Sequence, residues 1–463
     1  MFSDIPVDVS LAHAGERIRK NDLYVELGGP DVKEKFELVK VLQDGITDGT
    51  IKVVGPDISG MEPGKTYPIG IMIEIAGPEL ESDFEGVIER RIHEYANYID
   101  GFMHLNQRYD IWARLSKKSF NKGFNTLTYV GKVLEGLLKN EFPIIQQMQI
   151  TIYTDAEKIS PAHAEAVSSY EARDSRARGL TDKDVEVFYG CALCQSFAPN
   201  HVCIITPQRY ANCGAISWFD GRAAARIDPK GLIFPIEKGQ CLEPEKGEYT
   251  GVDESAKKRS FGEVNRVYLY SAFTYPHTSC GCFEGIAFYI PEVDGFGIVT
   301  RSYREPTVNG LAFSTMADST GGGRQIDGFH GISLEYMRSP KFISADGGYA
   351  RVVWMPADLK EMMKPFIPPE VFEKIPTEKD VKDVDELREY LKRQSHPAVE
   401  RWETKDEKPE EAHVEMPAFA PVFSGEEIPI SVGGIKLTLK NAKIYADRVI
   451  IQSARPRKPG SGE

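Results

Sequence analysis

The sequence predicts an α+β fold of two mixed α/β domains followed by a small carboxy-terminal β unit. Helix-type and strand-type patterns are interspersed up to about residue 183, and beyond it strand-like runs alternate with cysteine-bearing segments. The length of 463 residues is also too great for one ordinary core. We therefore expect an α+β domain at 1–183, a cysteine-rich domain at 184–402, a charged linker at 403–419, and a β unit with a disordered tail at 420–463.

The first domain shows both kinds of periodicity. β-branched residues at 51–54 and 69–75, and strict alternation at 148–152, predict three strands. Ser82 and Glu85 have the spacing of a capping box, and apolar residues at helical spacing predict a helix from Phe84 to Ile99. Ser160, followed by Pro161, is expected to cap a second helix that stops at Gly179.

The rest of the chain is predicted in the same way. Strands are expected at 286–290, 296–300 and 351–354, and helices at 357–366 and 384–394. A charged, proline-bearing stretch at 403–417 is typical of a linker. Two glycines at 433–434 between alternating apolar residues predict a hairpin over 428–439, with a further strand at 444–451. The final RPRKPGSGE is expected to be disordered.

Composition limits the class of protein. A formal net charge of −13 argues against a nucleic-acid binder, because phosphate affinity needs clustered Lys and Arg. The amino terminus lacks a signal-peptide pattern, and no apolar run has membrane-spanning length. We therefore expect a cytoplasmic protein with no nucleic-acid or membrane partner. Clustered cysteines in that compartment indicate metal ligands or catalytic groups rather than disulfides.

Six of the seven cysteines lie in two clusters. The first has the spacing C-x2-C-x8-C-x9-C and comprises Cys191, Cys194, Cys203 and Cys213. Four thiolates can hold one structural zinc ion or one iron–sulfur cubane. Zinc sites usually pair two short C-x2–4-C knuckles, and only one such pair is present here, which favours iron–sulfur. Cys241 stands apart and is interpreted as a small apolar residue or free thiol.

The second cluster is Cys280-Gly281-Cys282. Its two thiolates, together with the backbone amides of Gly281 and Cys282, can supply four donors in one plane. A planar N,S set selects Ni(II) or Cu(II). We expect glycine at the middle position because a Cβ there would crowd the chelate and restrict its dihedral angles. The alternative is a reduced thiol pair without a metal.

Three other features bear on ligands. Arg173, Arg176 and Arg178 have helical spacing and could clamp phosphates, although a solvated basic face paired with Glu171 and Asp174 is the simpler interpretation. Basic residues also surround Trp112. The glycine run at 321–323 lacks the Lys-Ser/Thr of a nucleotide P-loop, so we expect a tight loop passing close to a buried site.

Several segments together resemble the catalytic subunit of acetyl-CoA synthase, the partner of CO dehydrogenase. They are FYGCALCQSFAPNHVCIITPQR with Cys213 after it, SCGCFEG, HLNQRYDIWARLSK, RARGLTDKD, GGGRQIDGFHG and SPKFISADGGYARVVWM. The resemblance covers roughly residues 1–400 and includes all six clustered cysteines. The length resembles the short archaeal form, the β subunit of an acetyl-CoA decarbonylase/synthase complex, because the extra amino-terminal region of long bacterial members does not precede these segments.

The resemblance implies a nickel–nickel–[4Fe-4S] centre. The first four cysteines would hold the [4Fe-4S] cluster. Cys194, Cys280 and Cys282 would bind a proximal nickel, and Cys280 and Cys282 with the amides of Gly281 and Cys282 a distal nickel. Phe197 would limit access to the proximal metal. The implied enzyme is a CO-methylating acetyl-CoA synthase, an acyltransferase that reversibly joins a corrinoid-bound methyl group, CO and coenzyme A.

The implied partners are CO dehydrogenase subunits, a methyl-corrinoid iron–sulfur protein, and coenzyme A as a substrate. Coenzyme A carries phosphates, which makes Arg173, Arg176, Arg178 and Trp112 candidates for its binding. The linker and terminal β unit are candidates for attachment to the complex. The alternatives are a non-catalytic iron–sulfur electron-transfer or scaffold subunit, and a structural zinc protein.

Overall fold

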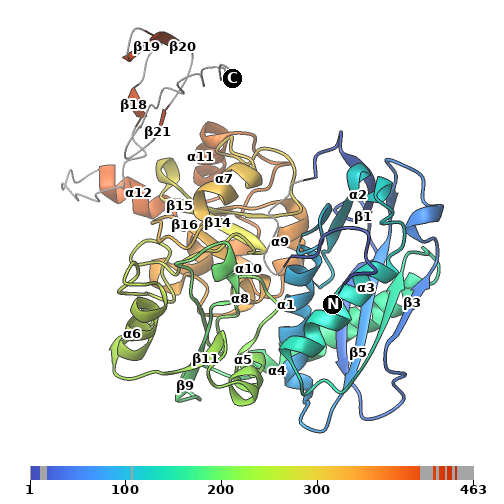
Figure 1. The fold of residues 1–463 in the computed structure, drawn as a ribbon. Coiled ribbons are helices and arrows are strands. Elements are labelled where there is room, and N and C mark those ends of the chain that lie inside the picture. Colours follow the sequence, from blue (N-terminus) through green and yellow to red (C-terminus); the bar gives the residue numbers. More distant parts are fainter. Residues whose placement is uncertain are drawn as a thin grey trace, which may run out of the picture. The chain divides into compact units, whose positions relative to one another are not determined.

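The computed structural model describes residues 2–10, 18–105, 108–406, 421–423, 427–432, 435–440 and 444–445. The chain divides into two compact units, Met1–Glu403 and Thr404–Glu463. Helices are combined with several separate sheets, which confirms the predicted α+β class (Figure 1). The division of the larger unit into 1–183 and 184–402 stays a prediction. Within the described ranges, no helix combines the length and apolar character needed to cross a bilayer.

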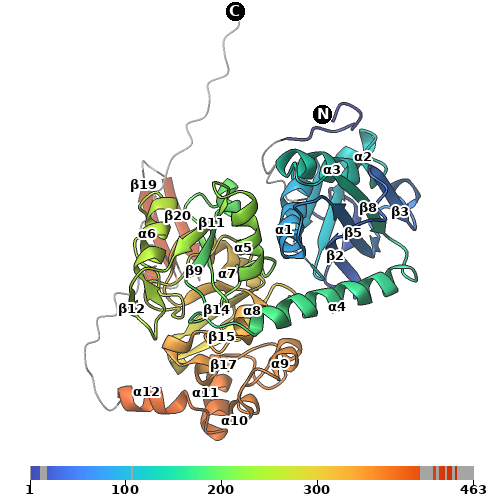
Figure 2. The same cartoon turned by 90° about the horizontal axis from the view of Figure 1, so that it is seen from below.

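The first part of the larger unit contains a four-stranded sheet with helices on both faces (Figure 2). On one face of the sheet, Phe36, Leu38 and Met72 pack on α4. The residues next to them along the strands point to the opposite face, where they pack on α1 and α3. The sheet has the order β2 (Lys35–Val41), β5 (Ile69–Ala76), β8 (Gln147–Tyr153), β3 (Thr50–Val54). The helices are α1 (Glu85–Ala96), α3 (Thr128–Glu141) and α4 (Ile159–Arg178).

A second sheet of this part contains the segment around Trp112. Its order is β4 (Thr66–Tyr67), β1 (Leu23–Gly28), β7 (Trp112–Ser116), β6 (Phe102–Leu105), and α2 (Lys117–Asn121) follows β7.

The second part of the larger unit carries the clustered cysteines, with Cys191 at the end of one strand and Cys203 at the start of the next. One sheet has the order β10 (Cys203–Ile205), β9 (Val187–Cys191), β11 (Ile233–Glu237), next to α5 (Trp218–Ile227). A small pair, β12 (Cys241–Glu243) and β13 (Glu248–Tyr249), precedes α6 (Thr250–Arg259).

The remaining sheet follows the second cysteine cluster directly. Its order is β16 (Phe329–Ile332), β14 (Gly285–Ile290), β15 (Gly295–Thr300), β17 (Val352–Trp354). The helices around it are α7 (Phe313–Thr320), α8 (Leu334–Arg338), α9 (Ala357–Met363), α10 (Pro369–Phe372), α11 (Val384–Arg393) and α12 (Val399–Asp406).

One apolar core joins the two parts of the larger unit. α1 is buried along its whole length. Its Ile88 and Ile92 belong to the same buried cluster as Cys191, Cys203 and Cys213. The polar side chains of α1 are therefore forced to find partners inside the protein, close to the cysteines.

The predicted strands of the larger unit and the helix at 384–394 are confirmed, but both predicted helix caps are wrong. Ser82 begins a short 3-10 turn, and α1 starts at Glu85 without a side-chain cap. Glu85 instead accepts a 2.7 Å hydrogen bond from the Val41 amide and pairs with Arg173. α4 starts at Ile159, and the Ser160 hydroxyl donates to Glu34. Each side chain found a tertiary partner that a local pattern cannot reveal.

Helix ends differ by a few residues. The helix predicted to Ile99 ends at Ala96. The helix predicted at 357–366 ends at Met363, because Pro365 follows its C-cap residue Lys364 and cannot donate a backbone hydrogen bond. The stop at Gly179 is confirmed.

The smaller unit contains the predicted hairpin, formed by β19 (Glu427–Val432) and β20 (Ile435–Lys440) in antiparallel register. A second pair joins β18 (Pro421–Phe423) to β21 (Ile444–Tyr445). The hairpin turn, most of the predicted linker, the rest of the strand predicted at 444–451 and the predicted disordered tail lie outside the described residues.

Candidate metal centre

The four cysteines of the first cluster lie together at one end of the β9–β10 pair. Cys191 ends β9 and is the register partner of Cys203, which begins β10. Cys194 lies in the 3-10 turn Leu193–Ser196, and Cys213 precedes α5. All four are buried free thiols.

Their thiols influence one another electrostatically. Burial raises the pKa of Cys191 and Cys203, and neighbouring cysteine sulfurs raise both further. Burial also raises the pKa of Cys213, to about 11. The Asn212 amide donates a 3.4 Å hydrogen bond to the Cys203 sulfur. Ionising such a group of buried thiols without a partner would cost much free energy. Binding the thiolates to a metal would offset that cost.

The second cluster meets the first at Cys194. Cys194 and Cys280 share a small buried cluster with Ala198, and Cys282 packs against it. The pKa of Cys194 is lowered well below its ordinary value because Cys280 and Cys282 hydrogen-bond to its sulfur, with Arg90 and His201 adding to the effect. The pKa of Cys280 is raised by the same contacts. Three sulfurs from two segments that lie far apart in the sequence therefore converge.

The backbone of the Cys-Gly-Cys unit turns so that the Cys282 amide faces the Cys280 sulfur. The Cys282 amide lies 3.3 Å from the Cys280 sulfur and donates to it. Gly281 has φ +133°, a region that residues with a Cβ rarely adopt. A Cβ at Gly281 would meet only Phe197, at an ordinary 3.9 Å. The dihedral angle therefore requires glycine here, whereas the expected crowding is absent among the described protein atoms.

Phe197 follows the 3-10 turn of Cys194 and lies against Gly281. Its side chain is 37% exposed. The ring thus stands between the Cys-Gly-Cys backbone and the surface.

The glycine run at 321–323 is the tight loop that the sequence predicts beside a buried site. The Gly322 amide donates to Cys280 O at 3.0 Å, and the Gly323 amide donates to Ser279 O at 2.8 Å. A Cβ at Gly323 would lie 2.6 Å from the His201 backbone nitrogen, and its φ is +80°. Only glycine lets this loop approach so closely.

α1 supplies site residues that sequence reasoning missed. The fully buried Arg90 donates a 3.2 Å hydrogen bond to the Cys194 sulfur, and its Nη1 has no partner among the described residues. The His93 Nε2 lies 3.7 Å from the Cys282 sulfur. Its Nδ1 contacts His104 at 3.1 Å, and His104 pairs with the buried Glu37. The available signal was the run of charged residues in a helix whose apolar residues predict burial.

Arg301 is the other missed residue. From the end of β15 it donates to the carbonyl oxygens of Gly281, at 2.7 Å, and Phe283, at 3.1 Å. The guanidinium also lies 5.1 Å from the centre of the Phe313 ring. Nothing in the local sequence marks this arginine, because its partners are backbone atoms of another segment.

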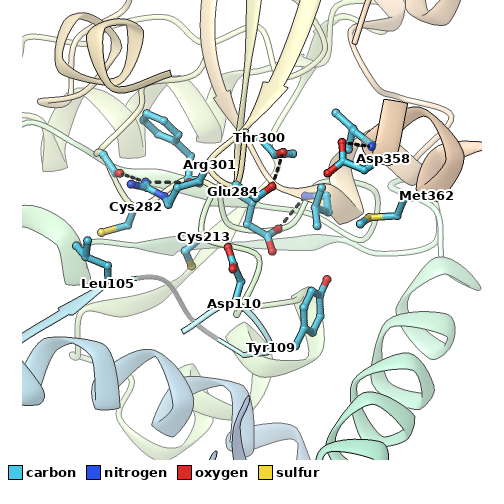
Figure 3. A pocket seen from close by; sticks show the side chains of 15 residues that line it. Leu105, Tyr109, Asp110, Cys213, Cys282, Glu284, Thr300, Arg301, Asp358 and Met362 are labelled. Carbon is cyan, nitrogen blue, oxygen red and sulfur yellow. Dashed lines mark hydrogen bonds between the residues drawn. The ribbon is translucent and has the colours of Figure 1, made fainter. Parts of the chain in front are cut away.

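A cavity of about 230 Å³ opens beside Cys282 (Figure 3). Burial raises the pKa of Asp110 above its ordinary value and raises the pKa of Glu284 to about 7. The residues that line the cavity come from both parts of the larger unit, and they include Leu105, Asp110, Cys213, Cys282, Glu284 and Arg301.

The three arginines near the end of α4 are bound to carboxylates. Arg173 pairs with Glu85 and Glu89, Arg176 with Asp83, and Arg178 with Glu171 and Glu335. The expected pairing with Glu171 is present for Arg178, whereas Asp174 pairs with Arg108. A phosphate would have to compete with these carboxylates, so a coenzyme A clamp at this point stays a prediction.

Trp112 has a different environment. Arg114 and Arg304 lie over its ring at 4.3 Å and 4.8 Å, and its indole Nε1 has no hydrogen-bond partner within the described part of the chain.

Cys241 is exposed in β12 and remains unassigned.

The residues at the centre fit a metal–sulfur group. No three Cys, His, Asp or Glu side chains of the described residues are already arranged around a single ion. A cubane does not need such an arrangement, because each iron corner takes its own thiolate. The buried Arg90, with an unpartnered N–H beside Cys194, is suited to an anionic group that the thiolates would complete.

This mixed α/β chain gathers six buried or half-buried thiols, of which Cys213 and Cys282 line the cavity, and such a set of thiols is suited to hold a metal–sulfur group. Residues 5–159 match the family described as "CO dehydrogenase/acetyl-CoA synthase complex beta subunit", and residues 170–403 match the family that describes the carboxy-terminal part of the ACS/CODH beta subunit. The chain belongs to this family of beta subunits, as its sequence motifs predict.

Curated relatives named acetyl-CoA decarbonylase/synthase complex subunit beta match nearly the whole chain. The protein of Methanothermobacter thermautotrophicus is 52% identical over 98% of this chain and 100% of its own length. That of Methanopyrus kandleri is 54% identical over 98% of each chain. The solved C-terminal domain of an acetyl-Coenzyme A synthase alpha subunit is 41% identical, covering 26% of this chain and 96% of that domain, with a TM-score of 0.23.

Proposed function

We propose that this protein reversibly forms and cleaves acetyl-CoA, as an acyltransferase of the CO-methylating acetyl-CoA synthase type. The names of its relatives support acetyl-CoA chemistry. The observation that carries the proposal is the contact of Cys194 with Cys280 and Cys282 beside a cavity. An electron-transfer or scaffold subunit with one iron–sulfur cluster would have no need for the Cys-Gly-Cys unit.

The thiols would hold a nickel–nickel–[4Fe-4S] centre. Cys191, Cys194, Cys203 and Cys213 would ligate the cubane, and Cys194, Cys280 and Cys282 the proximal nickel. The distal nickel would take the Cys280 and Cys282 sulfurs and the amide nitrogens of Gly281 and Cys282. These metals would supply a soft, reducible centre at which a methyl group, CO and a thiol are joined.

The protein's own residues control access to that centre. Phe197 covers Gly281, so it limits approach from the surface. The cavity beside Cys282 is smaller than the several hundred Å³ that usually enclose a drug-sized ligand, so only the thiol end of coenzyme A would enter it. Leu105, Phe283 and Met362 line it and would exclude water from the reacting groups.

Other binding roles follow from the same proposal. Coenzyme A phosphates would lie outside the cavity, where Trp112 with its two arginines, and Arg176 or Arg178, are candidates. The family name implies CO dehydrogenase subunits as partners, and a methyl-corrinoid iron–sulfur protein would supply the methyl group. The reaction would take place in the cytoplasm.

Metal analysis with an acetyl-exchange assay tests the proposal. The loaded protein should contain about two nickel per four iron. It should exchange acetyl groups between acetyl-CoA and coenzyme A, and nickel-free protein should not. Iron without nickel, and no exchange in either form, would instead indicate the electron-transfer or scaffold subunit. Zinc without iron would indicate a structural site.

A further inference from the structure

Two peptide groups of the Cys-Gly-Cys unit would supply nitrogen ligands, and each has its oxygen held by a donor from another segment. The first peptide group consists of the Cys280 carbonyl and the Gly281 nitrogen, and its oxygen accepts a hydrogen bond from the Gly322 backbone amide at 3.0 Å. The second consists of the Gly281 carbonyl and the Cys282 nitrogen, and its oxygen accepts a hydrogen bond from the Arg301 guanidinium at 2.7 Å. Each of these two oxygens therefore already has a hydrogen-bond donor within the described part of the chain.

The oxygen matters because the peptide bond is conjugated. When a metal replaces the proton on an amide nitrogen, the negative charge is shared between that nitrogen and the carbonyl oxygen. A donor aimed at the oxygen therefore stabilises the deprotonated form, as donors in an oxyanion hole stabilise a developing charge. A guanidinium does so most strongly, because the hydrogen bond is charge-assisted.

The surroundings make both donors rigid. The Arg301 Nη2 donates to both Gly281 O and Phe283 O, and the guanidinium lies near the Phe313 ring, so this nitrogen is held on the carbonyl side of the unit. The glycine run is anchored by the Gly323 amide on Ser279 O at 2.8 Å. The Cys282 nitrogen meanwhile faces the Cys280 sulfur. The Cys282 nitrogen thus faces a sulfur of the unit, while the two carbonyl oxygens accept from donors of other segments.

We infer that Arg301 and the Gly322 amide are positioning groups that stabilise the deprotonated backbone amides of Gly281 and Cys282 as ligands of a planar divalent metal. This inference rests on the proposed function. It also gives the glycine run a role, because a Cβ at Gly321 would lie 3.1 Å from Cys280 O, and Gly322 has φ +89°, a conformation that favours glycine.

The charges balance without a further reactant. On binding a divalent nickel ion, the two thiols and the two amides each release one proton to solvent. The four anionic donors leave an excess of negative charge on the unit, which the Arg301 guanidinium partly offsets. No electron is transferred.

The test measures nickel affinity and the absorption spectrum of planar nickel in the full chain, with iron content as the check of folding. Arg301→Met should weaken nickel binding at this unit by about 10- to 100-fold and alter its absorption, as loss of a group behind a ligand typically does. Arg301→Lys should recover most of the affinity. Arg324→Met is the matched control, and it should bind nickel as wild type does. Arg324 is exposed, and within the described part of the chain it donates only to Ser319 O.

The outcomes separate this inference from the proposed function. Wild-type protein without planar nickel would refute the proposed function itself. Nickel affinity and absorption of Arg301→Met equal to those of wild type would overturn the inference alone. If Arg301→Met loses its iron, Arg301→Lys and Arg301→Gln decide instead, because the charged lysine should bind nickel more tightly than the neutral glutamine. Equal affinities for those two would also overturn it.

Discussion

The arginines at the end of α4 and the arginine beside the cysteines are bonded in opposite ways. Arg173 contacts two carboxylates, of Glu85 and Glu89, and Arg178 contacts two others. Arg90 is more deeply buried, yet its hydrogen bond goes to a cysteine sulfur and one N–H has no partner among the described residues. In the first arrangement each arginine already has carboxylate partners and stabilises the fold, whereas the second becomes complete only when the cysteines carry negative charge.

The largest expected effect concerns the complete network. Replacing Arg173 with Met leaves Glu85 and Glu89 buried without their cation, so we expect a loss of about 3–5 kcal/mol in the free energy of unfolding. The measurement is chemical denaturation of metal-free protein at pH 8. Arg176→Met is the control, because that side chain is 50% exposed and should cost no more than about 1 kcal/mol. Similar losses for the two variants would contradict the contrast between them.

The pH dependence of stability tests the same network from the acidic side. Burial raises the pKa of Glu85 from 4.5 to about 7, against the opposing effect of Arg173. Between these pH values the native state holds a proton that the unfolded state has released. The contribution of this group is therefore full below pH 4.5 and is lost as the pH rises through about 7, by about 3 kcal/mol. Denaturation curves from pH 4 to 8 should show a smaller fall for Glu85→Gln than for wild type.

For Arg90, which lacks carboxylate partners among the described residues, we expect the opposite effect of a substitution on the stability of the metal-free protein. Replacing Arg90 with Met removes a buried charge without a carboxylate partner, so metal-free protein should be as stable as wild type or more stable. The iron–sulfur cluster should be held about 10- to 100-fold more weakly, because the positive charge beside Cys194 is gone. Denaturation and iron-release measurements on one variant suffice. A strongly destabilised metal-free Arg90→Met with normal iron retention would reverse our assignment of the two regions.

The smallest effect concerns coenzyme A. If Arg176 contributes to a phosphate clamp, Arg176→Ala should raise the KM for coenzyme A by about two- to fivefold, as expected for one partly exposed charge. Acetyl-exchange kinetics at varied coenzyme A measure it. An unchanged KM would remove Arg176 from the clamp and leave it only as the partner of Asp83.

The sequence by itself determined the features that are local. The alternation of apolar residues located the strands, since period two is fixed by the backbone. The cysteine spacings, the Gly281 requirement and the close-passing loop at 321–323 were likewise readable, because each depends on residues near in sequence. The family followed from the same motifs.

Only the tertiary structure decided which groups surround the sulfurs. Arg90 and His93 reach the cysteines from α1, and Arg301 reaches Gly281 O from the end of β15. The failed caps at Ser82 and Ser160 have the same origin, since Glu85 and Ser160 bind partners on other elements. The partner of a buried polar side chain depends on which segments lie next to it in space. Segments far apart in the sequence become neighbours only when α1 and the sheets pack around one core.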